Sequence, residues 1–111
     1  MSFNICGIQA TPDTMRSIDS ATFTGAYQAI GGPLTRVIRL VKFVNDSSVP
    51  VTVSWDGIND HDYIPANAFS LYDITSDKVR DDGFYIANGT QFYVKGAAGV
   101  RLVYLVCIGA T

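Results

Sequence analysis

Hydrophobic and polar residues alternate in short runs along most of this chain. In residues 51–55, two valines and a tryptophan share one parity, while a threonine and a serine take the other. Such alternation is typical of a strand with one buried face. Turn-forming pairs interrupt these runs at 56–57, 82–83 and 88–89. The pattern therefore predicts an all-β, antiparallel fold without helix-borne chemistry.

The same period places the individual strands. Residues 36–45 are apolar on both parities, which indicates burial on both faces or cover by a partner. Asn88-Gly89 predicts a type I′ hairpin between its flanking runs, and the parity of Trp55 predicts a core position. We expect a jelly-roll or immunoglobulin-like β-sandwich of about seven or eight strands. The predicted runs are 21–30, 36–45, 51–55, 68–74, 83–86, 90–95 and 100–108.

The first residues lack any such period. Residues 1–18 mix apolar Phe3, Ile5 and Ile8 with polar residues, Gly7 and Pro12. The segment is too apolar for a free tail and too irregular for a central strand. We expect an irregular N-terminal arm over 1–18 that lies against this subunit or a neighbour, followed by a β-sandwich domain over 19–111. We predict that another subunit buries these three apolar side chains.

Composition adds an expectation about partners. The chain has 111 residues, which suits one domain, and charged residues make up only 16%, against about 25% in an average soluble domain. The low charge favours a surface partly covered by other subunits, although serine, threonine, asparagine and glycine could supply the polarity instead. The net charge is −2 and the basic residues are scattered, so nucleic acid is not an expected partner.

The N-terminus carries no secretory signal pattern, and no apolar run approaches the roughly 20 residues of a membrane span. Synthesis and folding in a cytoplasm, without a membrane partner, are therefore expected. In that compartment Cys6 and Cys107 are expected to be buried thiols, with a bridge between them as the alternative.

Polar residues crowd one loop, where Asn59, Asp60, His61 and Asp62 follow Asp56. Their residue types suit turn formation, contact with a partner, or a calcium ion. A single histidine cannot build a multi-histidine zinc site, and no nucleophile elbow accompanies it. We therefore predict no enzyme activity, no catalytic residue, no cofactor and no metal. The candidate interface residues are Phe3, Ile5, Ile8, Asn59, Asp60, His61 and Asp62.

Three segments resemble small β-sandwich virion proteins of tailed bacteriophages. They are V-S-W-D-G-I-N-D-H-D-Y-I-P-A-N-A-F-S-L-Y-D-I-T-S, G-F-Y-I-A-N-G-T-Q-F-Y-V-K-G and V-R-L-V-Y-L-V-C-I-G, and the similarity covers about residues 35–110. It implies a non-enzymatic structural subunit that decorates or stabilises the capsid, or alternatively a collar, neck or tail accessory subunit at the head–tail joint.

The resemblance also implies a virion location after synthesis in the host cytoplasm. The implied partners are other copies of the chain and phage capsid or head–tail proteins, in a homo-oligomer. Its motifs are structural, so no catalytic residue carries over. A further alternative is a glycan- or protein-binding β-sandwich module that uses the loop 56–67.

Overall fold

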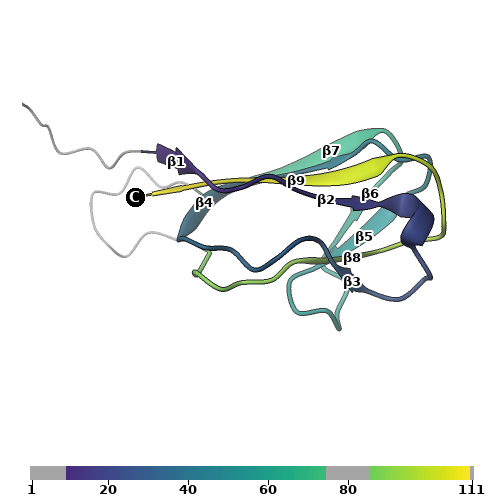
Figure 1. Ribbon diagram of the computed structural model, residues 1–111, viewed down its shortest axis with the longest axis horizontal. Coiled ribbons are helices and arrows are strands. Elements are labelled where there is room, and N and C mark those ends of the chain that lie inside the picture. Colours follow the sequence, from purple (N-terminus) through teal and green to yellow (C-terminus); the bar gives the residue numbers. More distant parts are fainter. Residues whose placement is uncertain (1–9, 75–85, 111) are drawn as a thin grey trace, which may run out of the picture.

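The computed structural model describes residues 10–74 and 86–110. Within them the chain forms two antiparallel sheets that lie as stacked layers in Figure 1. The one helical element of this part is a 3₁₀ turn, η1 (Ser20–Thr22). No helix in the described ranges is long and apolar enough to cross a membrane. The prediction of an all-β, antiparallel sandwich is confirmed.

Sheet A contains the N-terminal and C-terminal strands side by side. Its order is β1-β9-β4-β7, and β2 pairs with the same edge of β9 as β1. Sheet B has the order β3-β8-β5-β6. The strands of sheet A are β1 (Ala10–Pro12), β2 (Arg16–Asp19), β4 (Ile38–Asn45), β7 (Ala68–Asp73) and β9 (Leu102–Ala110). Those of sheet B are β3 (Gln28–Ala29), β5 (Val51–Ser54), β6 (Asp62–Ile64) and β8 (Tyr93–Lys95).

The core lies between the two sheets. Paired residues of an antiparallel ladder point to the same face, so Phe43 of β4 and its partner Leu105 of β9 both face inward and are fully buried. Phe43 meets Phe92 edge to face at 5.4 Å, a favoured geometry for two aromatic rings. The other buried hydrophobic side chains are Phe23, Ile30, Leu34, Ile38, Val41, Val51, Val53, Ile64, Ile86, Val94, Val103 and Cys107.

One buried amide joins two of the places where the chain passes between the sheets, the connections β4–β5 and β6–β7. Asn45, at the end of β4, is 0% exposed. Its Nδ2 donates to the carbonyl of Val49, in the turn to β5, at 2.9 Å, and to Ile64 and Pro65, at the crossing from β6 to β7, at 3.1 Å. Its Oδ1 accepts the N–H of Ser47. Asn45 therefore fixes both crossings relative to each other.

The N-terminal segment is more regular than the sequence indicated. Residues 10–18 form β1 and most of β2, both paired with β9 of the same chain. Pro12 pairs with Ile108 and Arg16 with Leu105, so the N-terminal segment carries one extra residue, as in a β-bulge. These two strands are short and lie at the edge of the sheet. They can therefore form without the alternation of hydrophobic and polar residues that marks a longer, half-buried strand. Phe3, Ile5 and Ile8 lie outside the described residues.

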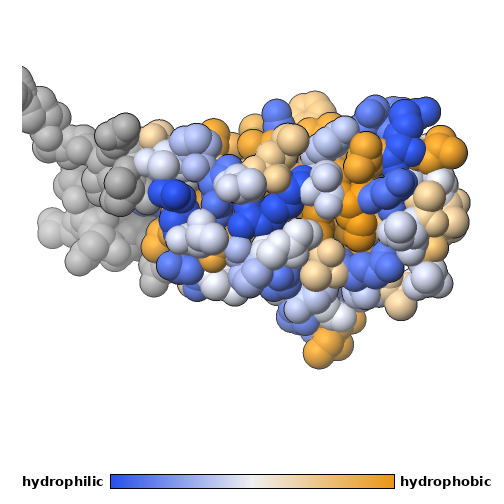
Figure 2. Space-filling view, in the orientation of Figure 1, coloured by the Kyte–Doolittle hydropathy of each residue, from blue (hydrophilic) through white to orange (hydrophobic). Residues whose placement is uncertain are grey.

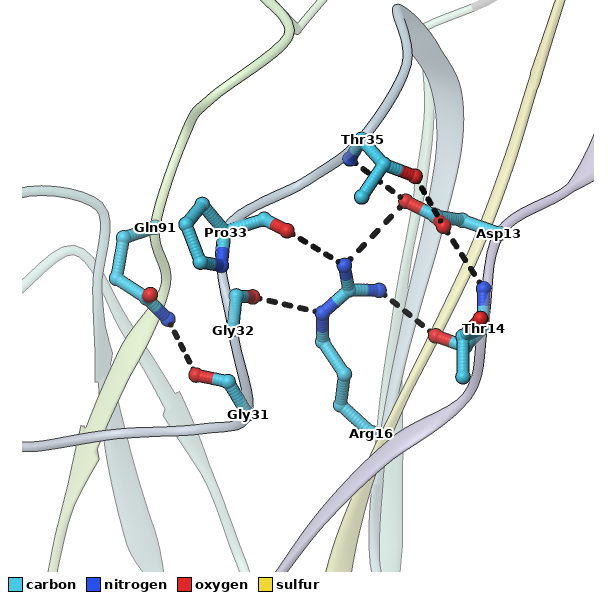
Figure 3. Close-up of polar contacts among 8 residues, drawn as sticks. All are labelled: Asp13, Thr14, Arg16, Gly31, Gly32, Pro33, Thr35 and Gln91. Carbon is cyan, nitrogen blue, oxygen red and sulfur yellow. Dashed lines mark hydrogen bonds and ion pairs between the residues drawn. The ribbon is translucent and has the colours of Figure 1, made fainter.

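At this bulge a buried arginine fastens the N-terminal segment to the loop before β4 (Figure 3). The side chain of Arg16 is 7% exposed, and its Nε donates to the carbonyl of Gly32 at 2.8 Å. Its terminal nitrogens donate to Pro33 and Thr14 carbonyls at 2.7 Å and pair with Asp13 at 3.4 Å. These bonds engage all three nitrogens of the guanidinium, and a buried guanidinium needs such partners. We call this group, residues 13–16 with 32–35, the Asp13–Arg16 clasp.

The contacts of the clasp also lower the pKa of Asp13 and keep its carboxyl group ionised. Burial alone would raise the pKa of this carboxyl, but the backbone and hydroxyl of Thr35, the N–H of Thr14 and the charge of Arg16 together lower the pKa from 3.8 to about 2. The two Thr35 bonds measure 3.1 and 2.8 Å. A carboxyl whose folded pKa is depressed stabilises the fold above its unfolded pKa and loses that contribution as pH falls through the folded value.

Asp13→Asn is therefore expected to lower the free energy of unfolding at pH 7 by about 1–2 kcal/mol. The difference between the variant and the unmodified chain should shrink as pH falls from about 4 to about 2, because Asp13 becomes neutral there in both states. Urea titrations at several pH values measure this. A difference that stays constant over that pH range would contradict the assignment.

The strand predicted over 21–30 is largely wrong. Only β3, at Gln28–Ala29, is a strand there. Gly25 adopts a φ of 88° and donates to the carbonyl of Gly96, which breaks the extended course. The alternating aromatic residues of this segment do not share one strand face but make unrelated contacts. Phe23 is 4% exposed in the core, whereas Tyr27 donates its hydroxyl to Asp60.

The type I′ hairpin predicted at Asn88-Gly89 is also wrong, although residues 83–85 of its first arm lie outside the described residues. Positive φ occurs at Gly89, 92°, but not at Asn88, which excludes type I′ and fits a type II turn. The segment 86–92 pairs instead with the start of β4 and the loop before it: Ile86 bridges Ile38 of β4, and the N–H of Gly89 donates to Leu34 of the loop at 2.8 Å. Both edges of β8 are taken by β3 and β5, so no edge remains for a hairpin arm.

Gly89→Ala is expected to cost about 1 kcal/mol through backbone strain. An added Cβ would meet no atom within 4 Å, so sterics should contribute nothing. Gly32→Ala is the matched control, because its Cβ site is equally open and its φ is not positive; its effect should stay within about 0.5 kcal/mol. Equal melting midpoints for the two variants would contradict the turn geometry.

Candidate functional site

The two sheets leave a pocket at one edge of the sandwich. Strand β7 ends the order of sheet A and β6 ends that of sheet B, and the two strands contact each other. Between them and the loop after β5 lies a pocket of about 620 Å³. We call it the edge pocket. It is lined by Trp55, His61, Asp62, Ser70 and Tyr72.

Trp55 lies at the mouth of this pocket and not in the core. Its side chain is 38% exposed, which corrects the prediction of a fully inward position. The ring does follow the parity of the strand, since it packs edge to face on Phe92 at 5.1 Å and tilts against Tyr72 at 5.9 Å. Strand β5 ends at Ser54, however. The Trp55 ring therefore lies just past the end of the strand, where the opposite sheet no longer covers it completely.

Asp62 links the two sheets at the floor of the pocket. It pairs with Val53 and so points inward, where its Oδ2 accepts the hydroxyls of Ser70, at 2.8 Å, and Tyr72. Its Oδ1 accepts the N–H of Tyr63 at 2.7 Å. Burial acts to raise the pKa of Asp62, and these hydrogen bonds from Tyr72, Ser70 and Tyr63 outweigh it, so the pKa is lowered.

Tyr72 shows the complementary effect. Burial and the hydrogen bond to Asp62 raise the pKa of the Tyr72 hydroxyl well above its ordinary value. At neutral pH the pocket therefore holds an ionised carboxylate beside protonated hydroxyls. A hydrogen bond to an ionised acceptor is roughly twice as strong as a neutral one, so Asp62 also helps to hold β6 on β7.

His61 faces the same pocket. Its backbone N–H donates to Val53 at 2.9 Å, and its Nδ1 accepts the backbone N–H of Trp55 at 3.0 Å. Because Nδ1 acts as an acceptor, the neutral imidazole carries its proton on Nε2, where it can donate. The histidine thus closes the loop after β5 and offers one donor to the pocket.

The polar cluster predicted from the sequence separates into two groups. His61 and Asp62 line the pocket, whereas Asn59 and Asp60 lie outside it. Asn59 donates its Nδ2 to Asp56 at 2.9 Å. Asp60 pairs with Lys95 at 3.1 Å and accepts the hydroxyl of Tyr27. Asn59 and Asp60 therefore hold the loop on its own chain.

Asp56 organises the turn that presents Trp55. Its Oδ1 accepts the backbone N–H groups of Ile58 and Asn59 at 2.8 and 2.9 Å, together with the hydroxyl of Ser54. The bonds from Asn59, followed by those from Ile58 and Ser54, hold the pKa of Asp56 well below its usual range. This is the turn chemistry expected of an aspartate before a glycine.

No three histidine, cysteine, aspartate or glutamate side chains gather as a metal site within residues 10–74 and 86–110. Cys107 is a free, buried thiol whose pKa is raised by burial to about 11. The sequence predicted its burial correctly, and Cys6 lies outside the described residues.

A second surface feature is the outer side of sheet A. Three rows of paired residues cross strands β7, β4 and β9 there. Every position except Lys42 and Asp73 is hydrophobic, and Phe69 and Leu71 are 65% and 49% exposed. Figure 2 views this surface edge-on and shows hydrophobic residues interspersed with polar ones along its upper margin, where β7 and β9 lie in Figure 1. We call this surface the outer apolar face. It comprises Leu40, Lys42, Val44, Phe69, Leu71, Asp73, Tyr104, Val106 and Ile108.

Comparison with known proteins gives no relative: no protein-family model, no curated protein and no solved structure matches this chain.

Asp62→Asn is expected to destabilise the fold by about 1–2 kcal/mol, because Ser70 and Tyr72 lose an ionised acceptor. Asp60→Asn is the control, since the Asp60 side chain is 60% exposed where it pairs with Lys95, and an exposed ion pair contributes little, so it should leave the melting midpoint unchanged. Thermal unfolding of both variants at pH 7 measures the difference. If Asp60→Asn proved the more damaging change, the role of Asp62 in joining the sheets would be wrong.

Proposed function

We propose that this chain is a non-enzymatic structural subunit of a tailed-phage virion, which decorates or stabilises the capsid through its outer apolar face. The observation that carries the proposal is the exposure of hydrophobic side chains across three strands of one sheet, with Phe69 and Leu71 at its edge. Contiguous apolar surface of this kind marks an interaction site. The low charge and the resemblance to small virion proteins support the same conclusion.

The face also carries information about its partner. Lys42 lies in the middle row, between Leu71 of β7 and Val106 of β9. An ammonium group covered by a partner is strongly unfavourable unless a carboxylate pairs with it. The partner that fits is therefore an apolar surface of a neighbouring virion subunit with an acidic side chain opposite Lys42.

The sandwich supplies a rigid platform for such a contact. The outer apolar face alternates residue by residue with the core, so its geometry is fixed by the packing of Val41 and Phe43 beneath it. A rigid surface loses little conformational entropy on binding. Many copies on one particle would add avidity to each single contact. The chain acts in this proposal at the particle, after synthesis in the host cytoplasm.

Phe69→Ser is expected to abolish binding to the particle without loss of folding, because its side chain is 65% exposed. Tyr63→Ser is the matched control: Tyr63 is 60% exposed on the outer side of sheet B. Both variants should unfold within about 0.5 kcal/mol of the unmodified chain. Binding is measured by co-sedimentation with phage particles that lack the chain, and electron cryomicroscopy then locates it on the capsid or at the head–tail joint.

A variant at Lys42 tests the chemistry of the partner. Lys42→Met retains the apolar stem and removes the charge, so it should weaken co-sedimentation if a carboxylate lies opposite. Retention of full binding by both Phe69→Ser and Lys42→Met would exclude the outer apolar face as the contact surface. Absence of density for the unmodified chain on intact particles would overturn the proposed function itself.

A further inference from the structure

The edge pocket combines an accessible aromatic ring with polar groups of both kinds. Trp55 is the one tryptophan of the chain, and its ring is held in place by Phe92 and Tyr72 while more than a third remains exposed. Ligand pockets typically join such apolar surface to a few fixed polar groups, in volumes of about 300–1,000 Å³. The edge pocket, at about 620 Å³, falls in this range.

The hydrogen-bonding capacity of the pocket is only partly used within the chain. The hydroxyls of Ser70 and Tyr72 both donate their hydrogen bonds to Asp62. Their oxygen atoms can therefore still accept hydrogen bonds from a ligand. His61 accepts at Nδ1 from Trp55 and keeps a donor at Nε2. A ligand that fits must therefore donate to oxygens on the β7 side and accept from an N–H on the loop side.

We propose that the edge pocket binds a neutral hexopyranose unit of a glycan, with the sugar ring stacked on Trp55 and its hydroxyls bonded to Ser70, Tyr72 and His61. Each sugar hydroxyl both donates and accepts, which matches the mixed set of groups. The C–H groups of a pyranose face are apolar and suit the exposed part of an indole ring. This binding is independent of the proposed assembly role, because the outer apolar face lies on the other side of β7.

Two other ligand classes fit less well. An anion such as phosphate would meet the ionised Asp62. A quaternary ammonium would suit Asp62 and the aromatic rings, but the Nε2–H of His61 and the hydroxyl oxygens held for hydrogen bonding favour a ligand with hydroxyl groups. A polyol without a ring could bond to the same groups but would not stack on Trp55.

The test uses the full chain and the methyl pyranosides of D-glucose, D-galactose, D-mannose and N-acetyl-D-glucosamine. Trp55 is the single tryptophan, so its fluorescence reports on the pocket directly. At least one pyranoside should change the emission saturably, with a dissociation constant of about 1 mM, as expected for a small ligand with few contacts. Sorbitol and tetramethylammonium chloride, at the same concentrations, should not.

Variants separate the stacking from the hydrogen bonds. By saturation-transfer NMR, Trp55→Ala should weaken the pyranoside at least about tenfold and Trp55→Phe less, because a smaller ring remains. Ser70→Ala and Tyr72→Phe should each weaken it about threefold to tenfold, since each removes one hydroxyl. Tyr63→Ala is the matched control and should bind normally, because Tyr63 lies on the outer side of sheet B.

Several outcomes would overturn the proposal. One is no saturable effect of any pyranoside up to about 50 mM, where a 1 mM site would be filled. Another is stronger binding of tetramethylammonium than of every pyranoside. A third is unchanged pyranoside affinity in both Ser70→Ala and Tyr72→Phe; should Trp55→Ala fail to fold, these two variants still decide. Phe69→Ser should bind the pyranoside normally, so a failure of the assembly role and a failure of the sugar site are distinguishable.

Discussion

The buried carboxamide of Asn45 fixes how the two sheets meet, and the surfaces of the molecule depend on that arrangement. Its Nδ2 bonds to carbonyls at two connections between the sheets, at Val49 between β4 and β5 and at Ile64 with Pro65 where β6 leads into β7. An amide buried with these partners is costly to move, since every broken bond leaves a polar group without water. Strand β6 therefore stays opposite β7, and the edge pocket keeps its width. A hydrophobic residue at this position could fill the space but could not join two backbone crossings.

Strand β7 serves both proposed surfaces through the period of the β-strand. Phe69 and Leu71 point to the outer apolar face, while Ser70 and Tyr72 point to the edge pocket. Successive side chains of a strand face opposite ways, so one short segment contributes residues to both proposed surfaces. Both surfaces therefore depend on the register in which β7 pairs with β4. A slip of β7 by one residue along β4 would place the polar side chains outside and the phenylalanine in the pocket.

The sequence predicted the fold class and the strands β4, β5, β7 and β9. It did not predict the sites in detail, for physical reasons that particular residues make clear. The alternation in β7 correctly assigned Ser70 and Tyr72 to one face and Phe69 and Leu71 to the other. Hydrophobicity alone, however, would have predicted that the face with the phenylalanine is the buried one. Trp55 followed its parity, yet its exposure depends on where β5 ends. The Asp13–Arg16 clasp joins residues far apart in the sequence, and Asn88-Gly89 turned out to pair with a distant loop, so local turn chemistry could not identify its partner.

The pairing of β1 with the end of β9 has a mechanical consequence. Ala10 and Ala110 are register partners, so the chain enters and leaves the sandwich at the same end, as the first and last described strands show in Figure 1. Tension applied between these two points would load the ladder in an unzipping direction, with its pairs opening one after another and not all at once. The separation would reach Pro12 and then meet the salt bridge and the carbonyl bonds of Arg16. Since these bonds run to another loop, the force would there be shared by the body of the sandwich, and the peeling of the first strand would be arrested.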